Sequence, residues 1–245
     1  VGSWRTVFTV GLALAGVGTV WSLRFGETLD PADRRPLGWA ATGEAFRRIA
    51  TSRTTVGYLI ALTFTGAAFF IWLGSSQPVF DLVYGRADQF AVMFSAGGVV
   101  TAVGFFSVGW FIKRYGAHRV AVTSIGVVLV LNIALVALVA RAGGRPSFWV
   151  WFILMTASNV FLSMVVPTGL ALALRPLGSI AGTAAGVIGA CSMAGAAVLA
   201  ALVDARISTT VTPMTVGYLL YGILALAAVL WARPESRDPT VQRNL

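Results

Sequence analysis

The chain has 245 residues, of which 57% are hydrophobic and only 11% are charged, and its formal net charge is +9. Soluble domains carry about 25% charged residues, so this composition excludes an ordinary water-soluble domain. The positive charge does not indicate nucleic-acid binding, because the basic residues fall in short segments between long apolar runs.

Seven apolar runs follow one another along the chain, and each is long enough to cross a bilayer. About 20 helical residues, rising about 1.5 Å each, cover a hydrocarbon core of about 30 Å. A span is either a helix or a strand of a closed barrel, and barrel strands have about 10 residues with strict alternation. We therefore predict an all-α integral membrane protein with seven transmembrane helices, over residues 7–23, 56–73, 90–112, 120–140, 148–174, 180–203 and 216–231.

Lysine and arginine are divided unequally between the two sides of the membrane. Thirteen fall on the side of residues 24–55 and five on the other side. By the positive-inside rule, the first side is cytoplasmic. This places the C-terminus in the cytoplasm of a multi-pass protein of the cell (inner or plasma) membrane, with the N-terminus outside. An odd number of spans that starts outside predicts a piece of a longer protein, with the missing part preceding it.

The longest interruption between spans is the segment from Arg24 to Thr55. Residues 37–49 within it have the pattern of a short amphipathic helix on the membrane surface, where Arg47 and Arg48 would face anionic lipid. A solvated linker is the alternative.

Four sets of residues occur in a fixed order along the chain. They are Trp4-Arg5-Thr6-Val7-Phe8; Glu27-Thr28-Leu29 with Arg34-Arg35-Pro36-Leu37; Gln77-Pro78-Val79-Phe80 with Tyr84-Gly85; and Ala181-Gly182-Thr183-Ala184-Ala185. Their order and spacing resemble the C-terminal part of a major facilitator superfamily drug/proton antiporter. The branch that the chain resembles confers resistance to bicyclomycin and chloramphenicol.

The resemblance implies that the seven spans are helices six to twelve of a twelve-helix transporter. Residues 1–23 would be the last helix of the N-terminal bundle and 24–55 the cytoplasmic central loop. Residues 56–232 would form the C-terminal six-helix bundle and 233–245 a cytoplasmic tail. The implied partners are the missing N-terminal bundle, a small drug-like substrate, protons and membrane lipid.

One family motif departs from its pattern. The family sequence Gly-x-x-x-Asp-Arg-x-Gly corresponds here to Gly109–Gly116, in which Lys113 replaces the acid and Arg114 is kept. In the family this acid helps to lock neighbouring helices through charge and helix-dipole contacts. The replacement leaves open whether Gly109, Arg114 and Gly116 act in gating.

Two further features are candidates for helix packing or gating. Gly182 and Gly186 are four residues apart, which lets two helix backbones approach closely. Pro167 removes a backbone hydrogen bond and should kink the fifth span.

Two spans carry polar or aromatic side chains at helical spacing. The second has Thr63, Gly66, Phe70, Gly74 and Gln77, and the fifth has Thr156, Asn159, Ser163 and Pro167. A polar stripe in a membrane faces protein or water rather than lipid. We predict that a substrate cavity is lined by Thr63, Phe70, Gln77, Thr156, Asn159 and Ser163. For Asn159 the alternative is a helix–helix hydrogen bond, and we assign Asn132 in the fourth span to packing.

The sequence does not have the pattern of an enzyme, a metal site or a cofactor site. It contains one histidine, His118, one cysteine, Cys191, and no phosphate-binding Gly-Lys-Ser/Thr motif. All nine carboxylates fall in loops or at span ends, and we expect Asp204 to be a solvated charge at the outer end. If the chain belongs to a proton-coupled transporter, the proton-carrying acid lies outside it.

We therefore expect part of a secondary transporter that exports amphipathic drugs in exchange for protons by alternating access. A complete seven-helix receptor or assembly subunit is one alternative. An importer of the same superfamily is another.

The charge asymmetry predicts that residues 24–55 and the C-terminal tail lie on the cytoplasmic side. A cysteine at Ser52, in a Cys191→Ser background, should react with a membrane-impermeant maleimide only after the membrane is permeabilised. Labelling from outside intact cells would overturn the predicted topology.

Overall fold

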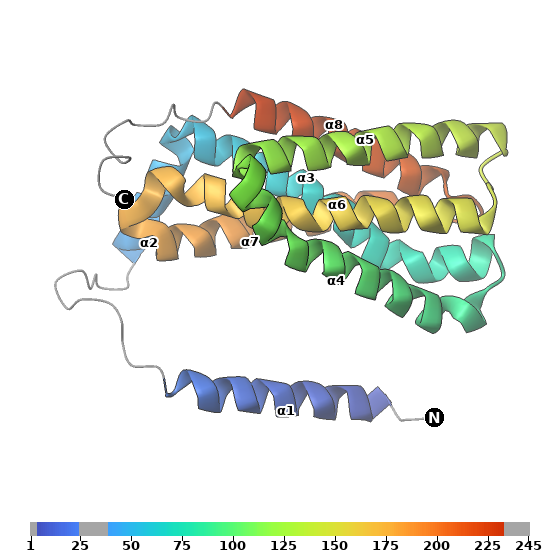
Figure 1. Cartoon of the computed structure of the whole chain (residues 1–245), viewed down its shortest axis with the longest axis horizontal. Coiled ribbons are helices and arrows are strands. Elements are labelled where there is room, and N and C mark those ends of the chain that lie inside the picture. Colours follow the sequence, from blue (N-terminus) through green and yellow to red (C-terminus); the bar gives the residue numbers. More distant parts are fainter. Residues whose placement is uncertain (1–3, 25–38, 233–245) are drawn as a thin grey trace. The chain divides into compact units, whose positions relative to one another are not determined.

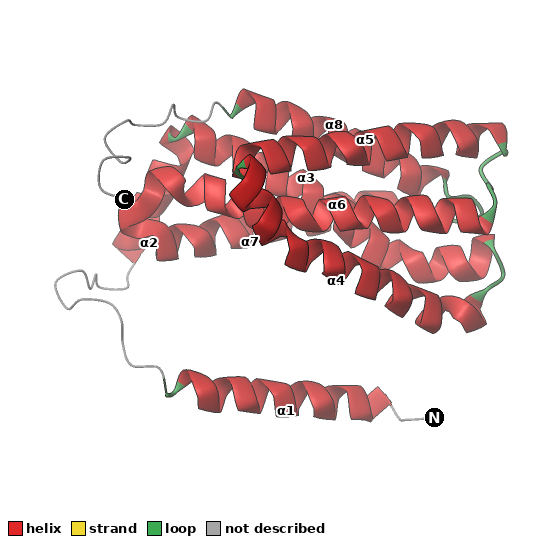
Figure 2. Ribbon diagram, viewed as in Figure 1, coloured by secondary structure: helices red, strands yellow, loops and turns green. Residues whose placement is uncertain are grey.

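The computed structural model describes residues 4–24 and 39–232, and every element of regular structure in these two ranges is a helix (Figure 2). The chain divides into two compact units, Val1–Gly38 and Trp39–Leu245. The first unit contains α1 (Trp4–Ser22), and all later helices belong to the second. Two of the sequence motifs, Glu27-Thr28-Leu29 and Arg34-Arg35-Pro36-Leu37, lie outside the described residues, as does the C-terminal tail.

Six of the described helices are long and apolar enough to cross a membrane, and α1 adds a shorter apolar stretch, Phe8–Ser22. The six are α3 (Arg53–Pro78), α4 (Phe90–Tyr115), α5 (Ala117–Arg141), α6 (Phe148–Leu174), α7 (Ala181–Asp204) and α8 (Thr212–Trp231). The predicted all-α membrane architecture is therefore confirmed.

The second predicted span, 56–73, is too short. The helix continues through the polar residues Gly74–Gln77 to Pro78, and a π-helical turn, η2 (Val79–Val83), follows it. The extension is compatible with a membrane because the hydroxyl groups of Ser75 and Ser76 both form hydrogen bonds within the protein. Ser76 Oγ donates to the Trp72 carbonyl, and Ser75 Oγ donates to the Asp204 carboxylate.

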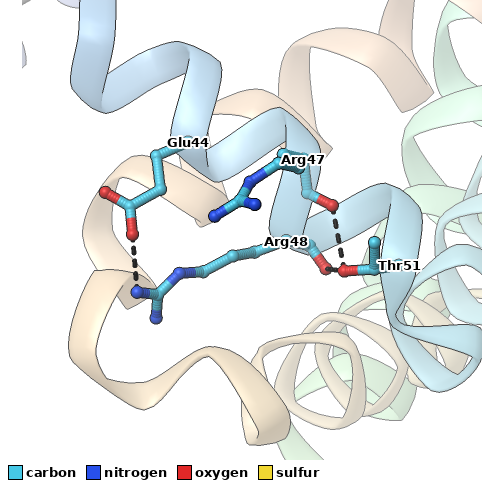
Figure 3. Close-up of polar contacts among 4 residues, drawn as sticks. All are labelled: Glu44, Arg47, Arg48 and Thr51. Carbon is cyan, nitrogen blue, oxygen red and sulfur yellow. Dashed lines mark hydrogen bonds and ion pairs between the residues drawn. The ribbon is translucent and has the colours of Figure 1, made fainter.

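The predicted amphipathic helix is present as α2 (Trp39–Thr51), and part of its apolar side packs on the bundle rather than lying free. Ala45 and Ile49 are buried in a cluster with Tyr58 and Leu177, and α2 packs on α7 and α3. On its polar side, Arg48 Nη2 lies 2.5 Å from Glu44 Oε1 (Figure 3). We call the bundle end that α2 covers the α2 end. It contains the starts of α3, α5 and α7 and the ends of α4, α6 and α8.

The six long helices form two sets of three, α3–α5 and α6–α8, and the two sets pack in an equivalent way. In the first set, α4 packs on α6 and α5 packs on α6 and α8; in the second, α7 packs on α3 and α8 packs on α3 and α5. The central helices α3 and α6 also pack on each other, as Figure 1 allows the reader to follow. Each outer helix therefore lies mainly on a central helix of the opposite set.

Glycine sets how closely these helices approach one another. A Cβ atom added at Gly104 of α4 would lie 2.6 Å from Val160 Cγ1 and 3.0 Å from the Val160 carbonyl oxygen of α6. A Cβ added at Gly195 of α7 would lie 2.8 Å from Thr63 Cγ2 of α3. Lipid provides no hydrophobic drive for helix association, so close van der Waals packing of this kind must hold the helices together.

Gly182 and Gly186 make no close helix contact with the described residues. Both are exposed, and an added Cβ would find nothing within 4 Å at either position. The close contact of α7 lies further along, at Gly195. The sequence pattern could not distinguish these positions because α7 contains glycine and alanine on several of its faces.

A polar contact links α5 and α6 in the bundle interior. Asn132 Nδ2 donates to Ser158 Oγ at 3.1 Å and to the Val128 carbonyl at 2.8 Å, and the side chain is fully buried. The packing role predicted for Asn132 is confirmed.

α6 itself continues without a break through Pro167.

The contact at Gly104 predicts a large effect of a small substitution. Gly104→Ala should lower stability by about 1–3 kcal/mol, because the Val160 carbonyl is backbone and cannot move aside. Gly109→Ala, on the same helix with nothing within 4 Å of the added Cβ, is the matched control. It should leave stability unchanged or raise it by up to about 1 kcal/mol through helix propensity. Unfolding of the purified protein in mixed micelles measures both, and equal effects would contradict this account of α4 packing.

Candidate substrate cavity

A cavity of about 430 Å³ lies between α3 and α4, and residues of α6 form part of its lining. It exists because α3 and α4 each pack on α6 rather than extensively on each other. Gly97 and Gly104 bring α4 close to α6, and Gly169 brings α6 close to Leu62 of α3. The lining from α6 consists of Leu162, Ser163 and Val166.

Aromatic rings form much of the cavity wall. Trp72 of α3 stacks on Phe94 of α4, with ring centroids 5.8 Å apart and planes at 15°. Behind Trp72, the Trp151 ring lies at 5.9 Å, so the indole is supported by the core. Phe69 and Phe105 complete the aromatic lining and are partly exposed, at 37% and 47%. Such a wall offers apolar and π contacts to a ligand.

Three hydroxyl groups are the polar features of the lining. Thr101 Oγ1 donates to the Gly97 carbonyl at 2.9 Å, and Ser163 Oγ donates to the Val160 carbonyl at 2.7 Å. Thr65 Oγ1 is buried and has no hydrogen-bond partner among the described residues. A buried hydroxyl without a partner is costly, by about 1–3 kcal/mol. The residues that line the cavity carry no charge.

Of the six predicted cavity residues, Ser163 alone lies in the lining. Thr63 Oγ1 bonds the Leu59 carbonyl at 2.9 Å and its methyl group faces Gly195 of α7, so Thr63 lies at a helix interface. Phe70 packs against the core cluster, and Gln77 is exposed near the far end of α3. Thr156 is buried opposite Gly97, at the α4–α6 contact.

The stripe predicted on α3 is therefore not the face that lines this cavity. The stripe that contains Thr63, Gly66 and Gly74 packs on α7, whereas the cavity is lined by Thr65, Phe69 and Trp72. At about 100° per residue, the lining residues of α3 are centred about 140° around the helix from this stripe. Both faces of α3 combine threonine with aromatic residues at helical spacing, and polarity alone does not select between them.

None of the cavity residues predicted from the sequence belongs to α4. Phe94, Gly98, Thr101 and Phe105 line the cavity at steps of four, three and four residues. This helical spacing was a usable signal. It was hidden because exposed valine and phenylalanine side chains surround these residues on the other faces of α4.

Asn159 makes a helix–helix contact rather than part of the cavity wall. It is 1% exposed, its Oδ1 accepts a hydrogen bond from the Tyr218 hydroxyl of α8 at 3.1 Å, and its Nδ2 donates to the Met155 carbonyl at 2.9 Å. The packing alternative stated from the sequence is therefore the one that the structure supports.

Asp204 is not the freely solvated charge that the sequence suggested. It is half-buried at the end of α7 and accepts a hydrogen bond from Ser75 of α3. Gly74 makes room for it, since an added Cβ would lie 2.6 Å from Asp204 Oδ2. This carboxylate joins α3 to α7 at the end of the bundle opposite the α2 end.

The Gly109–Gly116 segment ends in a one-residue turn between α4 and α5. Gly116 has φ +84°, a conformation that side-chain-bearing residues rarely adopt, so glycine is required there. Arg114 is exposed, with its guanidinium carbon 5.8 Å from the centre of the Tyr115 ring. Gly109 faces open space. The structure thus gives a conformational reason for Gly116 and leaves the predicted gating roles of Gly109 and Arg114 as predictions.

These features define a class of protein. The described part of the chain is a bundle of apolar helices with an uncharged, aromatic cavity between them, as expected of an integral membrane protein that handles small molecules. The sequence model of the Major Facilitator Superfamily matches residues 1–200. The chain therefore belongs to this superfamily of membrane transporters, whose halves contain nested three-helix repeats like the two sets described above.

A relative in Bacillus subtilis (strain 168), the uncharacterized MFS-type transporter YdgK, is 24% identical over 217 residues. The match covers 86% of this chain and 52% of the relative, so the chain spans about half the length of the protein that it matches. No solved structure matches the chain.

The contact between Asn159 and Tyr218 predicts coupled effects on stability. Asn159→Ala and Tyr218→Phe should each lower the free energy of unfolding by about 0.6–1.7 kcal/mol, the range for such bonds in membranes. The double variant should lose less than the sum, because both changes remove the same bond. Unfolding titrations in mixed micelles measure all three. Strictly additive losses would show that the two side chains do not interact.

Proposed function

We propose that the chain is the C-terminal half, with one preceding helix, of an antiporter that exports amphipathic drugs in exchange for protons. The observation that carries this proposal is the cavity between α3 and α4, with its aromatic wall and its few hydroxyl groups. Flat, apolar molecules of varied shape can stack on such a wall, and the hydroxyls can bond varied polar groups. A sugar or amino-acid site would instead need several fixed polar or charged partners.

The proposed mechanism is alternating access around this cavity. α4 and α7 are the least buried of the six spans, and in the proposal their exposed sides face the N-terminal bundle. The two bundles would rock against each other, so that the cavity opens first to one side of the membrane and then to the other. In this mechanism α3, α4 and α6 contribute the wall of the cavity, because its lining residues come from these three helices.

The proton-carrying acid in this proposal belongs to the N-terminal bundle. The four described carboxylates, Glu44, Asp81, Asp88 and Asp204, lie on α2 or at the opposite end of the bundle, outside the cavity lining. A carboxylate that exchanges protons along the pathway needs a position within the membrane, where burial shifts its titration toward neutral pH. In this division of roles, the chain described here binds drug and its partner bundle carries protons.

The charge distribution supports the proposed orientation of the bundle. The α2 end carries Arg47, Arg48, Arg53, Lys113, Arg114, Arg119 and Arg175 against Glu44. The opposite end carries Arg86, Arg141, Arg145 and Arg206 against Asp81, Asp88 and Asp204. The positive-inside rule then assigns the α2 end to the cytoplasm of the cell membrane.

Two neighbouring phenylalanines test the role of the cavity. Phe105 lines it, whereas Phe106 is 82% exposed and is not part of the lining. In the full-length protein, Phe105→Ala should change the resistance ratios among several amphipathic drugs by about tenfold for the largest ligands, because a lost ring contact of about 1.4 kcal/mol has that effect. Phe106→Ala should leave the ratios unchanged.

Drug susceptibility at matched expression, with drug accumulation measured in the same cells, gives the result. Equal profiles for the two variants would contradict a drug site in this cavity. Drug accumulation that rises with expression of the unmodified protein would overturn export and favour an importer of the superfamily.

A further inference from the structure

A second groove lies on the other side of α4. α4 and α5 meet at the Gly116 turn, and each packs on α6 (Figure 1). The groove has a volume of about 520 Å³. Phe161 and Met164 of α6 contribute to its lining, together with Phe111 of α4 and Val127 of α5. These apolar residues all belong to helices long and apolar enough to span a membrane, so their chemistry matches that of a lipid chain.

The same groove has a polar rim at the α2 end. Tyr115, His118, Arg119 and Thr123 belong to its lining. His118 is fixed in place, since its Nδ1 lies 2.7 Å from the buried Tyr58 hydroxyl of α3. Arg119 is exposed, and Lys113 and Arg114 are exposed on the same turn. The rim thus combines hydrogen-bonding groups with the permanent positive charge of Arg119, and Lys113 and Arg114 lie near it in the sequence.

These positive charges are not neutralised by the described part of the protein. Among the described residues, the one ion pair joins Arg48 to Glu44, and Glu44 is the one carboxylate at the α2 end. α5 begins beside the rim, at Ala117, and Gly116 gives its first turn no side-chain cap. The free N–H groups of this turn add a partial positive charge. An anion at the rim would therefore meet favourable charge, and the residues that line the groove include no carboxylate.

We propose that this groove binds an acidic phospholipid. One acyl chain lies between α4 and α5 on Phe161 and Met164, and the phosphate group lies at Arg119 and the start of α5. An arginine guanidinium is suited to phosphate because it can donate two parallel hydrogen bonds. The loss of the motif acid at Lys113 fits this ligand, because a carboxylate at that position would repel the headgroup. The site is separate from the cavity between α3 and α4 and does not depend on which substrate is transported.

The position of the groove suggests what the lipid does. α4 packs on α6 along one side and only slightly on α5. A bound acyl chain would fill the space between α4 and α5 and resist their closure. Occupancy should therefore stabilise the protein, because a ligand that binds the folded state alone raises its apparent stability.

Native mass spectrometry of the purified full-length protein tests the proposal. The probes are dioleoylphosphatidylglycerol and its zwitterionic counterpart dioleoylphosphatidylcholine, and the unmodified protein should bind the first more tightly. Arg119→Gln should weaken phosphatidylglycerol binding about fivefold, which corresponds to about 1 kcal/mol for one basic side chain near the surface. Arg141→Gln is the matched control, because it removes an arginine at the other end of the same helix.

A second variant tests the apolar part of the site. Val127→Trp fills the groove without changing the charge, so it should lower binding of both lipids to a similar extent. Arg119→Gln should weaken binding of phosphatidylglycerol more than binding of phosphatidylcholine, because the choline group already offsets the phosphate charge of the second lipid. Glycerol 3-phosphate, which has the headgroup chemistry without acyl chains, should not displace the lipid. Equal binding of the two lipids by the unmodified protein would overturn the proposal. So would equal phosphatidylglycerol binding by Arg119→Gln and Arg141→Gln, or displacement by glycerol 3-phosphate. If Val127→Trp does not fold, the arginine pair still decides.

Discussion

The fold depends on how closely α4 and α7 can approach the central helices. Inside a bilayer, apolar side chains gain nothing by leaving lipid for protein, so contact between backbones must hold the helices together. Gly104 provides this contact between α4 and α6, and Gly195 provides it between α7 and α3. A side chain at either position would separate the helices and open the interior to lipid.

The same constraint explains where the two grooves are. Because α4 lies against α6 along one line, it leaves space on both sides, toward α3 and toward α5. The residues that border each space then determine its chemistry. Trp72 and Phe105 make the first an uncharged aromatic cavity, whereas Arg119 and His118 give the second a polar and positively charged rim. One packing arrangement therefore produces two sites with different ligands, in the account proposed here.

The sequence was sufficient for the architecture because the bilayer imposes it. Spans must be helical and about 20 residues long, so apolar runs located α4 to α8 with errors of a few residues. The boundary of α3 was missed because Ser75 and Ser76 bond within the protein, and hydropathy does not register such partners. The sequence left open whether α2 is a helix on the membrane surface or a solvated linker, and the packing of Ala45 and Ile49 on the bundle is visible only in the fold.

The cavity was harder to predict because the rotation of a helix about its axis depends on its neighbours. On α3, Thr63 and Thr65 are equally plausible from sequence, and the close approach to Gly195 determines that Thr63 faces α7. Asn159 was a reasonable candidate by position, but Tyr218 lies 59 residues away in the chain and reaches it only in the folded bundle. Local periodicity does not contain this information.

The central claim is that drugs bind between α3 and α4. Photoaffinity labelling of the full-length protein with a diazirine derivative of an exported drug, followed by peptide mass spectrometry, measures the site directly. The account predicts labels on the segments 65–73 and 94–105, reduced by excess unmodified drug. Competable labels confined to α5 and α8 would contradict it.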